Sequence, residues 1–204
     1  MIQYDRQKMR AVVLRTCHAC RPADLGAVKL HKVLYYLDMM MYAHQRQAVT
    51  GATYLKRPNG PMASELLAAL RDMERDGDIR VDTVNYHGFL KKEYYALTDE
   101  PQDILNTEEQ SMLDDVIDFV CRKNTAKSIS DYSHALPWEM AELGGVIPYH
   151  SAMLLFPMQP TAEAFDLVEK GMAEIETARS QSNAVGMQDI TTFRSSVLSA
   201  VGQR

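Results

Sequence analysis

Apolar residues recur at spacings of three and four along most of this 204-residue chain, which is the periodicity of amphipathic helices. The stretch 25–45 is apolar around most of its girth, so we expect it to be the central helix, buried on several sides. Asp24 is its expected cap, and Thr107–Gln110 is a predicted capping box at the start of a later helix. The pattern predicts helices over residues 5–20, 25–45, 61–76, 107–123, 125–135, 138–143 and 161–175, and a last amphipathic piece over 189–201.

Two regions depart from this helical spacing and predict strands. Residues 53–57 are a short strand candidate, and Pro61 is expected to begin the next helix, because its missing N–H would be unpaired at that position anyway. Residues 79–84 and 89–97 flank a turn and predict a β-hairpin. The expected fold class is mainly α (α+β): a compact helical bundle with a small antiparallel β-hairpin and a C-terminal helical extension.

Composition places the chain among ordinary globular proteins, with 46% apolar and 24% charged residues. The net charge is −5 and the pI about 5.7, so no overall positive field draws the chain to nucleic acid or anionic lipid. The N-terminus lacks the pattern of a secretory signal. The longest apolar-rich segment, Val33–Ala43, is interrupted by Asp38 and is too short to span a bilayer. We therefore expect no membrane association and a cytoplasmic location.

Two groups of residues look like chemical sites. Cys17 and Cys20 have the spacing of a zinc knuckle, but the chain has no second pair, and both fall on the apolar stripe of the first helix. We expect them to pack as small hydrophobes with no metal or other cofactor, and a thiol- or metal-dependent enzyme remains an alternative. Ser133 and His134 follow Asp131, yet adjacent side chains rarely form the relay of a catalytic triad, and we expect no catalysis there.

A helix followed by a hairpin is also the arrangement of a winged helix, so DNA binding has to be weighed. The candidate recognition helix, residues 62–76, carries two arginines and four acidic residues, a net charge of −2. Contact with phosphates normally requires an accumulation of Lys and Arg on one face. A DNA-binding transcriptional regulator is therefore kept as an alternative and is not favoured.

The most informative motif is Lys29-Leu-His-Lys-Val-Leu-Tyr-Tyr, followed after a short strand by Gly60-Pro61. Further on, Ser133-His134 precedes Trp138 and Gly145-Val-Ile-Pro148. In this order the motifs resemble the SocA-like (Panacea) antitoxin domain, and the resemblance covers roughly residues 24–155. The expected organisation is this domain with an extra N-terminal helix over residues 1–160, and a C-terminal helical extension over 161–204.

The resemblance implies an antitoxin-like module of a bacterial or phage toxin–antitoxin pair. It implies a binding protein and not an enzyme, which neutralises a cognate protein toxin by direct, steric contact and uses no cofactor. Self-association is left open. The family-motif residues, and hence the partner-binding candidates, are Lys29, Lys32, Tyr35, Tyr36, Gly60, Pro61, His134 and Trp138.

Each of these candidates also has a purely structural interpretation. The two lysines would pack their stems and hold their ammonium groups in water. The two tyrosines would be core aromatics whose hydroxyls find a partner. Trp138 would anchor an irregular loop onto the bundle, and His134 would cap a backbone group. In the C-terminal piece, the apolar stripe with Phe193 and Val197 follows a flexible joint and needs an apolar surface to cover, so we expect it to contribute to partner or self-association.

Overall fold

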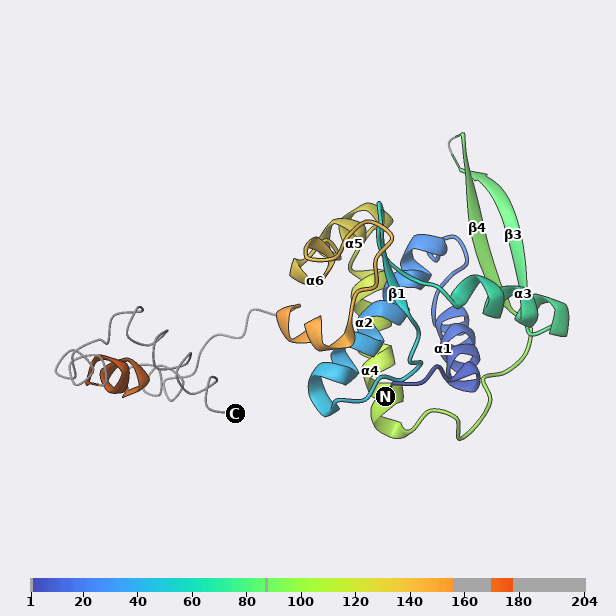
Figure 1. The fold of residues 1–204 in the computed structure, drawn as a ribbon. Helices are drawn as coiled ribbons and strands as arrows, with labels where there is room; N and C mark the ends of the chain where they lie inside the picture. The colour runs from blue at the N-terminus through green and yellow to red at the C-terminus, as the bar shows by residue number, and fades with distance from the viewer. Residues whose placement is uncertain (1, 87, 156–169, 178–204) are drawn as a thin grey trace, which may run out of the picture. The chain divides into compact units, whose positions relative to one another are not determined.

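The computed structural model describes residues 2–86, 88–155 and 170–177 (Figure 1). The chain divides into two units, Met1–Phe156 and Pro157–Arg204. The first unit contains the helices α1 (Arg6–Ala19), α2 (Ala27–Gln45), α3 (Leu66–Asp76), α4 (Thr107–Ile117), the π-helical η1 (Asp118–Arg122), α5 (Ala126–Tyr132), α6 (Leu136–Glu139) and the 3-10 helix η2 (Tyr149–Leu154). Its strands are β1 (Tyr54–Arg57), β2 (Gly60–Ala63), β3 (Ile79–Tyr86) and β4 (Phe89–Ala96). The predicted class, mainly helical with a small antiparallel β component, is confirmed.

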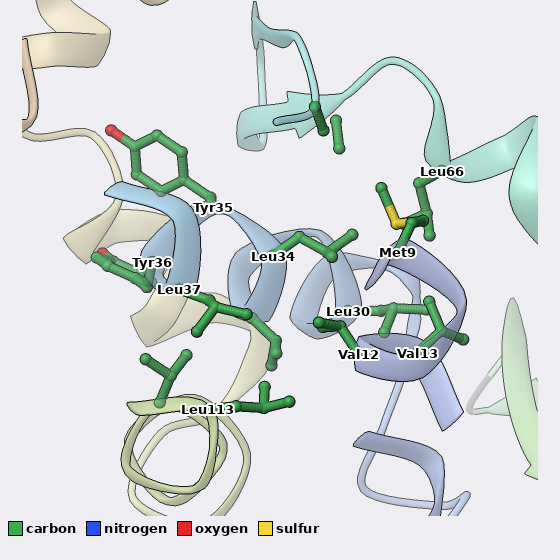
Figure 2. Close-up of a cluster of buried hydrophobic side chains, with 14 of the residues drawn as sticks. Met9, Val12, Val13, Leu30, Leu34, Tyr35, Tyr36, Leu37, Leu66 and Leu113 are labelled. Carbon is green, nitrogen blue, oxygen red and sulfur yellow. The ribbon is translucent and has the colours of Figure 1, made fainter. Parts of the chain in front are cut away.

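Helix α2 is the centre of the first unit, as its sequence predicts. It contacts α1, α4, α5, β2 and η2, so several sides are covered at once. Figure 2 shows its apolar side chains between those of α1 and α4. Leu30, Leu34 and Leu37 are fully buried, and each such side chain contributes about 1.5–3 kcal/mol to folding. Helix α1 supplies the predicted stripe that packs here, including Met9. Asp5 caps its N-terminus, because the Asp5 carboxylate accepts from the backbone N–H groups of Gln7 and Lys8.

Two antiparallel strand pairs complete the unit. The predicted hairpin is confirmed: β3 pairs with β4 from Ile79↔Ala96 to Tyr86↔Phe89, and it extends outward beside α3 (Figure 1). The shorter pair, β1 and β2, runs from Tyr54↔Ala63 to Arg57↔Gly60. An isolated bridge joins Leu55 of β1 to Val146, which fastens the segment after α6 to this pair.

The expectation that Pro61 begins a helix is wrong. Pro61 lies in β2 opposite Lys56, and α3 begins only at Leu66. Proline has no N–H to donate, but it is tolerated in a strand that has a free edge. Gly60 adopts a φ of +92°, which permits the tight turn from β1 into β2.

Two predicted caps are also corrected. Helix α2 is preceded by Gly26, which makes no side-chain cap, while Asp24 instead pairs with Arg21 at 2.6 Å. The capping box of α4 lies one residue earlier than predicted: Asn106 accepts from the Glu109 N–H at 2.9 Å, and the Glu109 carboxylate accepts from the Asn106 N–H at 3.0 Å. Glu and Gln are both suitable at the third helical position. The sequence is therefore compatible with a capping box that starts at Asn106 and with one that starts at Thr107.

The C-terminal unit is described over residues 170–177 only, which are helical and expose Met172 and Ile175. The expected helix start at Thr161 and the segment with Phe193 and Val197 lie outside the described residues. In the ranges that are described, no helix has both the length and the hydropathy needed to cross a membrane.

Candidate partner-binding site

Five of the family-motif residues meet at the turn between β1 and β2. Lys32 of α2 donates through Nζ to the carbonyls of Asn59, at 2.7 Å, and Pro61, at 3.0 Å. Its side chain lies beneath the turn and the residue is only 2% exposed. The interpretation that Lys32 holds its ammonium group in water is therefore wrong, because the turn carbonyls replace the water. Ser130 of α5 also donates to the Asn59 carbonyl, at 3.0 Å, so helix and turn are fixed to each other.

Gly60 allows this close approach. A Cβ at this position would overlap Oγ of Ser133 and Nζ of Lys32, and the φ of +92° is itself unfavourable for any other residue. Glycine is required here both for space and for backbone conformation. The Gly-Pro motif therefore serves the junction of α2, the β1–β2 turn and α5.

Trp138 and His134 also lie at this turn. The indole Nε1 of Trp138 donates to the Arg57 carbonyl at 3.0 Å, which ties α6 to the end of β1. The His134 ring stacks on the indole at a centroid distance of 4.0 Å, and Nζ of Lys56 lies 4.1 Å from the indole centroid. Burial is the main cause that lowers the pKa of His134 below its ordinary value, which favours the neutral ring.

The other three motif residues lie away from the turn. Lys29 is buried and donates to the Cys121 carbonyl at 2.9 Å, so the snorkelling interpretation is wrong for this lysine too. Tyr35 is fully buried and packs edge-on against Tyr36 and Tyr54, at centroid distances of 5.4 and 5.3 Å. Its hydroxyl has no hydrogen-bond partner in the described part of the chain, contrary to the expectation.

Tyr36 leads to a second feature, an apolar groove of about 360 Å³. Its wall is aromatic: Phe119 of η1 packs edge-on against Tyr36 at 5.5 Å and lies 6.3 Å from the ring of Tyr132. The groove is lined by Tyr36, Met40, Asp115, Val116, Phe119, Tyr132, Ala135 and Leu155. Exposed apolar side chains continue along α6 and the loop after it, at Leu136, Met140 and Leu143. Exposed apolar surface of this kind is typical of sites that bind another protein.

Sequence reasoning missed the buried carboxyl of Asp38. This residue is 0% exposed and accepts from the Thr50 N–H (2.7 Å) and hydroxyl (2.5 Å), and from the hydroxyls of Tyr54 (2.8 Å) and Tyr149 (3.0 Å). Desolvation raises its pKa above the ordinary value, while these hydrogen bonds act in the opposite direction. A single acidic residue inside the apolar segment Val33–Ala43 was the available signal.

The alternative functions depend on the cysteines and on the candidate recognition helix α3. Cys17 and Cys20 are both buried, and Cys20 shares a cavity with Cys121, which Cys17 does not line. No group of three or more His, Cys, Asp or Glu side chains suited to a metal ion occurs among the residues described. On α3, Arg75 pairs with Asp72 at 2.9 Å and with Asp76 at 3.3 Å. In these ion pairs the charge of the arginine is already balanced by neighbouring carboxylates.

The burial of the Lys32 amino group predicts how the free energy of unfolding depends on pH. Burial lowers the pKa of Lys32 from 10.5 to about 7, and a neutral amine still has one hydrogen for each of its two carbonyl partners. Between pH 7 and pH 9 the unfolded chain retains the proton and the folded chain does not, so the free energy of unfolding rises with pH, by at most about 1.4 kcal/mol per unit. Denaturant unfolding at pH 7, 8 and 9 measures this slope.

Lys32→Met should lose this contribution to the slope, and Lys127→Met, which changes an exposed lysine, should keep it. Other groups that titrate in the window are common to all three proteins and cancel in the comparison. Equal slopes for the wild type and Lys32→Met would show that Lys32 stays charged when folded.

Comparison with known proteins adds one finding. The family model described as "Antitoxin SocA-like, Panacea domain" matches residues 30–139. This range begins just after Lys29, ends just after Trp138 and is narrower than the range 24–155 expected from the motifs. Searches of curated proteins and of solved structures gave no match.

Proposed function

The chain belongs to the SocA-like antitoxin family with a Panacea domain, whose role lies in toxin–antitoxin systems, and from this membership we propose that it neutralises a cognate protein toxin by direct binding. In this proposal the protein makes and breaks no bonds, and it acts in the cytoplasm by occluding a surface of the toxin. The family match over residues 30–139 is the observation that carries the proposal.

The polar groups of the motif residues hydrogen-bond within the fold, which supports a binding role over a catalytic one. Lys29, Lys32 and Trp138 donate to backbone carbonyls of the same chain, which leaves these groups engaged in holding the fold together. An active site needs ionisable groups that converge on a space where a substrate can lie. The motif residues instead build a rigid scaffold beside the apolar groove.

We further propose that the groove beside Tyr36 receives an apolar segment of the toxin. Phe119 is 36% exposed and Tyr132 63% exposed, so both offer aromatic surface to a partner, whereas Tyr36 forms the buried floor. Aromatic anchors of this kind dominate the binding energy of protein interfaces. Asp115 is the acidic residue at the groove, so a toxin segment with a basic residue beside its apolar side chains would fit best.

The function is tested by co-expression with the neighbouring reading frame. We expect that frame to arrest growth when expressed alone, and the present protein to restore growth and co-purify with its product. Growth arrest that persists although both proteins are present and folded would contradict neutralisation. Restored growth without co-purification would contradict direct binding.

The groove is tested by a substitution at its rim. Tyr132→Asp places a charge where the toxin's apolar side chains would lie, and we expect a loss of about 2 kcal/mol in binding, which is about 30-fold in Kd. The loss is measured by calorimetric titration with the toxin. Phe89→Asp is the matched control, because Phe89 is also an exposed aromatic residue and lies at the tip of the β3–β4 hairpin, away from the groove.

We expect Phe89→Asp to bind like the wild type. If Phe89→Asp abolishes binding and Tyr132→Asp does not, the toxin contacts the hairpin and the groove assignment is wrong, while the antitoxin function stands. Circular dichroism of both variants establishes that they are folded before binding is measured.

A further inference from the structure

The fold brings together two cysteines that are far apart in the sequence. Cys20 is the C-cap residue of α1 and Cys121 lies in η1, and the folded chain places both at one cavity. The neighbouring residues are in contact as well, since Nη2 of Arg122 reaches the Ala19 carbonyl at 3.5 Å. The pair therefore arises from tertiary packing, and the Cys17–Cys20 spacing does not create it.

Both thiols line a cavity of about 520 Å³. Its rim includes Arg21, Arg122 and Thr125, which are exposed residues, so the cavity that both cysteines line opens toward solvent. Cys17 does not line this cavity, although all three cysteines belong to the same buried cluster. The two kinds of thiol thus differ in access, although all three cysteines are buried by area.

The cavity also distinguishes the thiols electrostatically. Nζ of Lys29 is fixed on the Cys121 carbonyl at 2.9 Å, and Arg122 follows Cys121 directly. The neighbouring Cys121 side chain, helped by the positive charges of Arg122 and Lys29, lowers the pKa of Cys20 below its ordinary value. Burial raises the pKa of Cys17 to about 12. Because the thiolate is the reacting species, Cys20 is the activated cysteine and Cys17 the inert one.

We propose that Cys20 and Cys121 are a redox pair, which a hydroperoxide converts reversibly into an intramolecular disulfide. The Cys20 thiol gives its proton to solvent, and the thiolate attacks the terminal peroxide oxygen. The O–O bond breaks, and the leaving oxygen takes up a proton as water or alcohol. Cys121 then attacks the sulfur of the Cys20 sulfenic acid, the S–O bond breaks, and the hydroxide leaves with the Cys121 proton as water. Two electrons pass from the sulfur atoms to the peroxide.

The proposed disulfide would join α1 to η1. It closes a covalent loop that includes α2 and both strand pairs, and it fixes η1, which also carries Phe119. Cross-links that close long loops restrict the unfolded chain most strongly. We therefore expect the oxidised protein to unfold at a higher denaturant concentration than the reduced protein.

The test treats the full-length protein with a small molar excess of hydrogen peroxide, followed by alkylation and mass spectrometry. We expect a monomer that has lost two hydrogen atoms, a proteolytic peptide pair joined through Cys20 and Cys121, and one alkylated thiol at Cys17. Dithiothreitol should reverse the change. A disulfide that includes Cys17, a disulfide only between two chains, or sulfinic acid at Cys20 without any cross-link would each overturn the proposal.

Three substitutions sharpen the test. Cys17→Ser should still form the cross-link. Cys121→Ser should instead leave a sulfenic acid at Cys20, trapped by dimedone, because the resolving thiol is gone. Cys20→Ser should form neither product. Iodoacetamide should also alkylate Cys20 at least about tenfold faster than Cys17 in the folded wild type. That measurement needs no variant, so equal rates would contradict the activation of Cys20 even if a variant failed to fold.

Discussion

Asp38→Ala is expected to destabilise the protein by about 4 kcal/mol, a large part of the 5–15 kcal/mol that typically holds a domain folded. The substitution leaves three buried donors without an acceptor: the Thr50 N–H, the Thr50 hydroxyl and the Tyr54 hydroxyl. Each unsatisfied buried donor costs about 1–3 kcal/mol, and removal of a buried carboxyl offsets part of this sum. Urea denaturation followed by circular dichroism measures the loss.

The fourth partner should contribute little to that loss. The hydroxyl of Tyr149 has a second acceptor, the Ala52 carbonyl at 2.7 Å, so it keeps a hydrogen bond when the carboxyl is removed. Asp38→Asn preserves the size and one carbonyl oxygen, and we expect it to lose less than Asp38→Ala. Asp131→Ala, at an exposed position, is the control and should change stability by less than about 0.5 kcal/mol. A loss below about 1 kcal/mol for Asp38→Ala would mean that water replaces the carboxyl.

Most of the helical framework could be predicted because helix faces are encoded locally. The stripe Met9, Val12, Val13 and Cys17 needs only its own spacing to define the buried side of α1, and the structure buries all four residues. The same holds for α2, whose apolar girth indicated burial on several sides. The β3–β4 hairpin was predictable too, since its two strands and their turn are adjacent in the sequence.

The parts that could not be predicted depend on contacts between distant residues. Locally, Gly60-Pro61 is compatible with the start of a helix. These residues form a strand instead, because β2 pairs with β1 and accepts a hydrogen bond from Nζ of Lys32. The polar ends of Lys29 and Lys32 were expected in water, because the sequence does not reveal that carbonyls of distant segments surround them. The pairing of Cys20 with Cys121 likewise exists only in the folded chain. Of the candidate site, the motif residues could be named in advance, but their contacts in the junction and the groove residues Phe119 and Tyr132 could not.

Gly60→Ala is expected to cost about 3 kcal/mol or more, from two separate causes. A residue with a Cβ pays about 1–2 kcal/mol for the left-handed backbone conformation, and the Cβ would overlap Ser133 and Lys32, for which overpacking costs about 1–3 kcal/mol. Because Ser133 is the C-cap residue of α5 and Lys32 belongs to α2, the clash separates the elements that the turn joins. The expected result is a lower denaturation midpoint and, at growth temperature, reduced neutralisation of the toxin.

Gly77→Ala separates the two causes. Gly77 has a similar φ of +82°, but a Cβ there meets no atom within 4 Å, so only the conformational cost applies. We expect Gly60→Ala to be the more destabilising of the two by at least about 1 kcal/mol. Adding Ser133→Ala to Gly60→Ala removes one of the two overlaps and should recover part of the difference. If Gly60→Ala and Gly77→Ala lose the same stability, the junction has room for a methyl group, and glycine is needed at this turn for its backbone conformation alone.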